Sequence, residues 1–144
     1  MSNVDSGHPA NVARLFMVSA ALEFGAGLAL VVAPAAIVRL LFGAAVSVFP
    51  AAGIVQLTGV ALLSLSAACW WARADDRSTA SGAIVWAMLI YNVGVLALVL
   101  LGGLGALGLV QWTAVVIHAA MGSWCGRVAA RPMPLGRIDQ RLER

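Results

Sequence analysis

Five polar residues within the long apolar stretches of this chain are the candidates whose side chains could do chemistry there. They are Glu23, Gln56, Tyr91, Asn92 and His118. A carboxylate and an imidazole can exchange protons or bind a cation, and amide and phenol groups donate and accept hydrogen bonds. A charged side chain at the centre of a membrane helix costs about 2.5–3.5 kcal/mol, so it rarely faces lipid. We therefore expect these five residues to form an internal polar cluster.

Two interpretations of this polar cluster stay open. In the structural one, a neutral Glu23 shares a hydrogen bond with His118 or Asn92 and fastens the helices together; such bonds contribute about 0.6 kcal/mol on average. In the functional one, Glu23 and His118 exchange protons or a cation during transport or redox work. Burial and pairing act on the charge of such groups in opposite directions, so both charge states are compatible with the sequence.

A third interpretation is a metal or haem site. His118, Met121 and Cys125 share one helix face and are weak candidate ligands. The other histidine, His8, lies in the N-terminal tail, so one chain cannot supply two histidine ligands from two spans. We expect no cofactor.

No serine stands in a sharp-turn motif beside a histidine and an acid, so we expect no catalytic residues and no enzymatic activity.

The composition places these residues in a membrane protein. Of 144 residues, 62% are hydrophobic and 10% are charged, whereas soluble domains contain about 25% charged residues. The net charge is +3, and all nine cationic side chains are arginine. These arginines form no basic stripe interleaved with aromatic residues, so a nucleic-acid partner is not expected.

Apolar segments that could cross a bilayer, which takes about 20 residues, occur four times. They cover residues 14–33, 51–72, 82–101 and 109–129. Pro34 ends the first segment because proline lacks the donor that the next turn needs, and "GGLGALG" predicts a tight connection between the last two. Ala35–Phe42 is predicted to form a short interfacial helix, with Arg39 facing lipid headgroups. The predicted fold is an all-α, four-helix transmembrane bundle over 14–129, with tails at 1–13 and 130–144.

The distribution of arginines predicts the orientation. With four spans, one side of the membrane holds only Arg39. The other side holds Arg14, Arg73, Arg77, Arg127, Arg131, Arg137, Arg141 and Arg144. Cytoplasmic loops carry the excess of arginine, so both termini are predicted to lie in the cytoplasm of a bacterium, with the chain in its inner membrane. Anionic headgroups would contact Arg39, Arg127, Arg131 and Arg137.

Four stretches of residues 15–127 carry a resemblance: "LEFGAGL", "TGVALLSLSAACWWAR", "YNVGV" and "WTAVVIHAAMGSWC". Together they resemble a group of small bacterial inner-membrane proteins with four spans, and in size and span count the chain is similar to DoxX-type membrane proteins. The resemblance implies the four-span bundle but brings no established activity. In that group an arginine commonly stands where this chain has Gln56, so an intramembrane Glu–Arg pair would be missing here.

The leading functional prediction is a non-enzymatic accessory or assembly component whose polar cluster fastens its own helices or those of a partner. Its expected partners are the lipid bilayer and either a larger membrane complex or further copies of the chain. The alternative is a proton-linked carrier of a small molecule or ion that uses Glu23. A minor alternative is a redox subunit associated with haem, a metal or a quinone.

Overall fold

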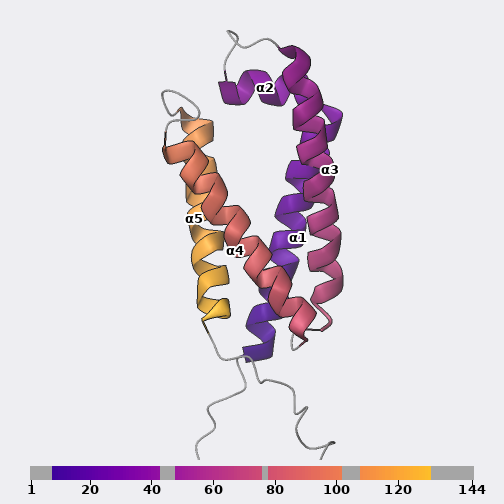
Figure 1. Ribbon diagram of the computed structural model, residues 1–144, viewed down its shortest axis with the longest axis vertical. Helices are drawn as coiled ribbons and strands as arrows, with labels where there is room; N and C mark the ends of the chain where they lie inside the picture. Colours follow the sequence, from indigo (N-terminus) through magenta and orange to yellow (C-terminus); the bar gives the residue numbers. More distant parts are fainter. Residues whose placement is uncertain (1–7, 43–47, 76–77, 102–107, 131–144) are drawn as a thin grey trace, which may run out of the picture.

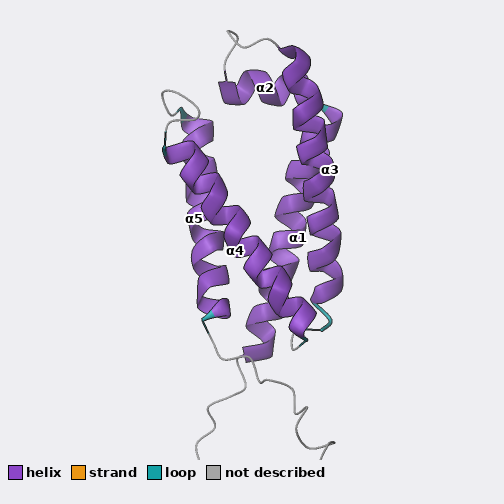
Figure 2. Ribbon diagram, viewed as in Figure 1, coloured by secondary structure: helices purple, strands orange, loops and turns teal. Residues whose placement is uncertain are grey.

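The computed structural model describes residues 8–42, 48–75, 78–101 and 108–130. Within these ranges the regular structure is helical throughout, with no strand (Figure 2). The helices are α1 (His8–Val32), α2 (Pro34–Phe42), α3 (Val48–Ala72), α4 (Thr79–Leu100) and α5 (Leu109–Ala129). The all-α prediction is confirmed.

The helix ends follow the local sequence. α1 ends at Val32, and Pro34 is the first residue of α2, a position where the missing proline N–H has no partner to lose. α4 begins after Ser78, whose hydroxyl oxygen accepts a hydrogen bond from the backbone N–H of Ser81 at 3.1 Å. A serine at this position satisfies one of the free amide groups of the first turn.

Two helices extend beyond the predicted membrane spans. α1 begins at His8, before the span predicted from residue 14, and α3 begins at Val48, before the span predicted from residue 51. Each of these helices has a proline in its first turn, Pro9 and Pro50. Proline is tolerated there because first-turn N–H groups have no helical acceptor. A proline close to the start of an apolar segment therefore did not mark the first residue of the helix.

Among the described residues, three helices are long and apolar enough to cross a membrane. The spanning segments are Asn11–Val32, Ala52–Ala72 and Thr79–Leu100. α5, the fourth predicted span, has 21 residues but falls outside this group because residues such as Gln111 and His118 lower its hydropathy. By length and composition, the chain is a small all-helical membrane protein.

The long helices are arranged as two pairs, α1 with α3 and α4 with α5 (Figure 1). Contacts within each pair are far more extensive than contacts between the pairs. In Figure 1, α4 runs obliquely from the foot of α3 to the opposite side of the molecule. The pairs lie close together at the lower end and separate toward the upper end, where α2 lies transverse to them.

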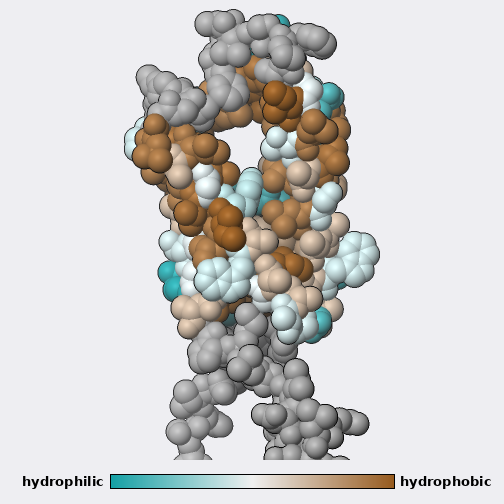
Figure 3. All heavy atoms as spheres, in the orientation of Figure 1, coloured by the Kyte–Doolittle hydropathy of each residue, from teal (hydrophilic) through white to brown (hydrophobic). Residues whose placement is uncertain are grey.

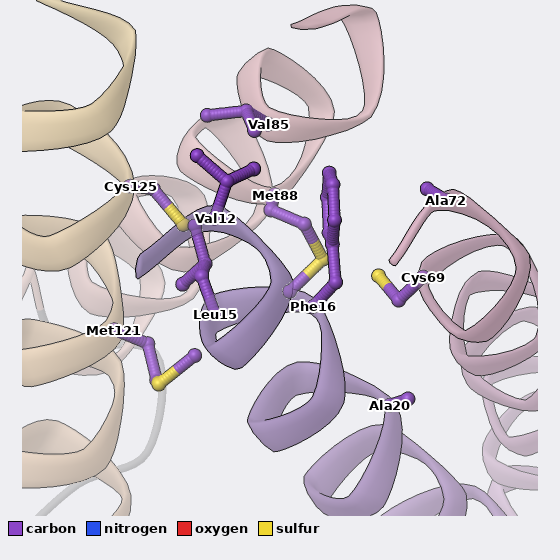
Figure 4. Packing of buried hydrophobic residues seen from close by; sticks show 10 residues of the cluster. All are labelled: Val12, Leu15, Phe16, Ala20, Cys69, Ala72, Val85, Met88, Met121 and Cys125. Carbon is purple, nitrogen blue, oxygen red and sulfur yellow. The ribbon is translucent and has the colours of Figure 1, made fainter. Parts of the chain in front are cut away.

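The hydrophobic core (Figure 4) lies where α1 begins, which is the lower end of the molecule in Figure 1. It combines the start of α1, the end of α3, the start of α4 and the end of α5. Its buried members are Val12, Leu15, Phe16, Ala20, Cys69, Ala72, Val85, Met88, Met121 and Cys125. In Figure 4 the ring of Phe16 stands between Met88 and Cys69. The core therefore joins the two helix pairs at one end only.

Small residues bring α1 and α3 together. A Cβ atom added to Gly27 would lie 2.8 Å from the carbonyl oxygen of Gly59, and one added to Gly59 would lie 2.8 Å from that of Gly27. Nearer the core, the Ser66 hydroxyl donates to the carbonyl oxygen of Ala20 at 2.8 Å. Close backbone approach at small residues is a common basis of helix association in membranes.

The polar side chain of Gln111 connects α2 to α5 at the upper end of the molecule. The Gln111 side chain donates from Nε2 to the carbonyl oxygen of Leu41, at 2.6 Å. Its Oε1 atom accepts from the backbone N–H of Gly108 at 3.0 Å. Gln111 therefore holds the end of α2 against the start of α5.

Candidate intramembrane binding site

A cavity of about 170 Å³ lies between α1 and the α4–α5 hairpin. Its lining combines apolar side chains with four of the five predicted polar residues. The lining residues are Ser19, Leu22, Glu23, Ala26, Tyr91, Asn92, Ala114, Ile117, His118 and Met121. Figure 3 shows this face of the molecule hollowed between the two helix pairs, with hydrophilic surface at the lower edge of the opening. The structure thus brings Glu23, Tyr91, Asn92 and His118 together from three helices.

Asn92 connects α4 to α5. Its side chain is 1% exposed, and Nδ2 donates to the carbonyl oxygen of Met88 at 2.7 Å. Oδ1 lies 2.8 Å from Nδ1 of His118. Because a carbonyl receives the amide N–H of Asn92, the amide oxygen faces the imidazole, and Nδ1 of His118 must be the donor. In a neutral ring Nε2 is then an acceptor.

The Tyr91 ring meets the imidazole edge-on. The centroids of the Tyr91 and His118 rings are 5.5 Å apart, at an interplanar angle of 77°. This arrangement places the positive edge of one ring against the negative face of the other. His118 is therefore held both through Nδ1 and through its ring.

Glu23 lacks the partner that a helix-fastening role would give it. Its side chain is 6% exposed and lines the cavity, yet it forms no hydrogen bond or ion pair with any residue in the described part of the chain. Ser19, one turn earlier on the same face of α1, has a buried hydroxyl that also lacks a partner there. Buried polar groups are nearly always hydrogen-bonded, so the Ser19 hydroxyl is left without its usual pairing among the described residues, and the carboxyl group of Glu23 is left to the cavity.

Gln56 is the predicted cluster residue that the structure does not bring to the cavity. Its side chain is exposed, and Nε2 donates to the carbonyl oxygen of Val31 at 3.2 Å. This bond ties α3 to the end of α1. The five predicted residues therefore do not form one cluster, because Gln56 lies nearer the upper end and on the α1-facing side of α3.

The three weak metal-ligand candidates do not share one site. His118 and Met121 line the cavity, whereas Cys125 is fully buried in the core (Figure 4). Cys125 is seven residues beyond His118 on α5, which corresponds to about 10 Å along the helix axis. No group of three or more histidine, cysteine, aspartate or glutamate residues with metal-binding placement occurs among the residues described.

The candidate headgroup-binding arginines lie near helix ends where they fall in the described ranges. Arg39 on α2 and Arg127 in the last turn of α5 are exposed; Arg131 and Arg137 lie outside the described residues. Arg73 is one of the predicted cytoplasmic arginines but was not predicted to contact headgroups. Its guanidinium carbon lies 3.5 Å from the ring centroid of Trp70, and it also donates to the carbonyl oxygen of Trp70. This stacked pair suits a membrane–water interface.

Ser19 was not predicted to be a site residue. It precedes Glu23 by four residues, so the helical repeat places both on one face. This four-residue spacing could have indicated from the sequence that Ser19 lies beside Glu23.

No family model, curated protein or solved structure matches the chain. The class of protein is therefore defined by the fold and the cavity alone: a small all-helical membrane protein with an internal polar site.

Proposed function

We propose that this protein binds a small molecule or ion in the cavity between α1 and the α4–α5 hairpin, and that Glu23 exchanges a proton or cation there as part of a carrier cycle. One observation carries the proposal. Glu23 is a largely buried residue that lines a cavity, and its carboxyl group has no hydrogen-bond partner in the described part of the protein. A carboxyl group that served only to fasten helices would be bonded to another helix.

The proposal includes a membrane arrangement. Four spans form the bundle, both termini lie in the cytoplasm, and the membrane is the inner membrane of a bacterium. The length of α5, 21 residues, and its packing along α4 support a fourth span. The arginine distribution supports the orientation. α2 lies at the outer interface, with Arg39 toward the headgroups.

The binding role can be tested without knowing the ligand. Purified protein in lipid nanodiscs is incubated with a bacterial metabolite extract, and the retained small molecules are identified by mass spectrometry. We expect at least one molecule to be retained by the wild type and lost from Glu23→Gln, because the amide cannot exchange a proton or carry the charge. The same molecule should then be transported by proteoliposomes in a pH-dependent manner.

The matched control is Asp75→Asn, because Asp75 is an exposed carboxylate away from the cavity. This control should retain the molecule. A set of retained molecules that is identical in wild type and Glu23→Gln, with both proteins folded, would contradict the proposal.

A second candidate function is the accessory or assembly role, in which the polar residues fasten helices. The contact between Asn92 and His118 favours it, since this bond joins α4 to α5. This role predicts that Glu23→Gln keeps expression, folding and activity, and that membrane proteins copurify with the chain in mild detergent. Neither proposal assigns a catalytic reaction to the chain. A haem-, metal- or quinone-associated redox role is the third alternative, and visible absorbance of the purified protein would favour it.

A further inference from the structure

We infer that the cavity selects a protonated primary or secondary amine whose apolar part is about the size of one ring. The inference rests on the proposed function and names its ligand class. It follows from a comparison of the polar atoms around the cavity that already have a hydrogen-bond partner in the protein with those that have none among the described residues.

The open groups are mainly acceptors. Asn92 uses Nδ2 on Met88 and Oδ1 on His118. Because Nδ1 of His118 donates to Asn92, the atom left for a ligand is Nε2, an acceptor in the neutral ring. The ionised carboxylate of Glu23 only accepts. A ligand that meets an imidazole acceptor from α5 and a carboxylate from α1 must supply N–H or O–H donors.

The charge around the cavity points to a cation. Among the described residues, the lining contains one carboxyl group, Glu23, and neither lysine nor arginine. An anionic ligand would therefore meet a like charge with no lysine or arginine to compensate it, which is unfavourable in a low-dielectric site. An ammonium group would pair with Glu23 in a charge-assisted hydrogen bond. Tyr91 lines the same cavity, and its ring face attracts cations.

One further polar group, the hydroxyl of Ser19, fits an amine. The buried hydroxyl of Ser19 has no partner among the described residues, and a hydroxyl can accept a hydrogen bond from an ammonium group. A primary ammonium carries three donors. Those donors match, in number and kind, the acceptors carried by three residues that line the cavity: the carboxylate of Glu23, Nε2 of His118 and the hydroxyl of Ser19.

The cavity volume limits the apolar part of the ligand. At about 170 Å³, it is close to the apolar cavity of about 150 Å³ that accommodates benzene in another protein. Its apolar walls are Leu22, Ala26, Ala114, Ile117 and Met121. A single ring or a branched alkyl group of similar size would fill this space.

The test compares three compounds with the same ring and different polar groups: benzylamine, benzyl alcohol and benzoate. Binding to the full chain in zwitterionic lipid nanodiscs at neutral pH is measured by ligand-observed NMR, with empty nanodiscs as the background. We expect benzylamine to bind about tenfold more tightly than benzyl alcohol, and benzoate not to bind, because a hydrogen bond to a charged group contributes about that factor or more. Glu23→Gln should weaken benzylamine by a similar factor and leave benzyl alcohol unchanged. Asp75→Asn should change neither.

A cavity-filling variant, Ala114→Phe, separates failure of this inference from failure of the proposed function. If benzyl alcohol or benzoate binds at least as tightly as benzylamine, and Ala114→Phe removes that binding, the amine class is wrong and the intramembrane site stands. If no compound shows binding that Ala114→Phe removes, the amine inference is overturned, and the metabolite-retention experiment decides the function independently. The comparison among compounds uses the wild type, so it holds even if a variant does not fold.

Discussion

Two serines on the α1–α3 pair bury their hydroxyl groups in different ways. Ser66 donates to the carbonyl oxygen of Ala20 at 2.8 Å, whereas the hydroxyl of Ser19 has no partner among the described residues. We expect Ser66→Ala to lower the free energy of unfolding by about 1 kcal/mol, and Ser19→Ala to leave it unchanged or raise it, because only the first removes a hydrogen bond. Reversible unfolding in mixed detergent micelles measures both. Equal losses for the two variants would show that Ser19 is bonded within the protein.

The contact between Asn92 and His118 is measurable as a coupling energy. Asn92→Ala, His118→Ala and the double variant form a double-mutant cycle, and we expect a coupling of about 0.6 kcal/mol and below about 2 kcal/mol, the range of hydrogen bonds between membrane helices. Thr113→Ala is the control, since the Thr113 hydroxyl donates to Leu109 within its own helix. Pairing His118→Ala with Thr113→Ala should give no coupling. A coupling near zero would show that the contact between Asn92 and His118 adds nothing to the packing of α4 against α5.

At the scale of single residues, the sequence predicts how far along a membrane helix a residue lies better than it predicts which neighbour the side chain contacts. Glu23, Tyr91, Asn92 and His118 could be placed near mid-span by counting along apolar segments, and they line one cavity. Gln56 also lies in an apolar segment, but counting does not show which neighbour its side chain reaches. It bonds to Val31 instead. Asn92 and His118 pair because of the crossing of α4 and α5, which no single-helix pattern contains.

At the scale of elements, the contact between α1 and α3 depends on two glycines. We expect Gly27→Ala and Gly59→Ala each to lower the free energy of unfolding by about 1–3 kcal/mol, because overpacking a tight interface has this cost. In each case the new Cβ atom would approach a backbone carbonyl of the other helix to 2.8 Å. Thermal or detergent-induced unfolding of the purified protein measures the loss.

The same two helices supply matched controls for these glycine variants. A Cβ atom added to Gly25 on α1 or to Gly53 on α3 has no neighbour within 4 Å. Gly25→Ala and Gly53→Ala should therefore be neutral, or stabilising by up to about 1 kcal/mol through helix propensity. If all four variants behave alike, α1 and α3 do not approach each other at Gly27 and Gly59.

Most helices were predictable from the sequence, and their ends less so. The apolar segments at 51–72, 82–101 and 109–129 correspond to α3, α4 and α5, and the short helix before α3 was expected within one residue of its start. The early starts of α1 and α3 were missed, because a proline permits a helix to begin before it as well as after it. The Gly27–Gly59 contact was also out of reach, since small residues occur on several faces of these helices.

At the scale of the whole molecule, the sequence indicates a membrane protein. It does not indicate that the long helices form two pairs that separate toward one end. The core joins the two pairs at one end, and α2 with Gln111 connects them at the other. The polar cavity lies between these two connections. A compact bundle with pairing of all neighbouring helices would have placed Glu23 against another helix, whereas the separated pairs leave it facing the cavity.

The number of spans decides on which side of the membrane the C-terminus lies. Three helices meet the requirements of length and hydropathy, and α5 is the proposed fourth span. Because each span reverses the side, a reporter fused after Arg144 should be active only in its cytoplasmic form if α5 crosses, and only in its exported form if α5 does not. A fusion after Leu101, at the end of α4, should be active in its exported form in either case and serves as the control. Exported activity after Arg144, with the control behaving as expected, would place α5 outside the bilayer and remove His118 from an intramembrane site.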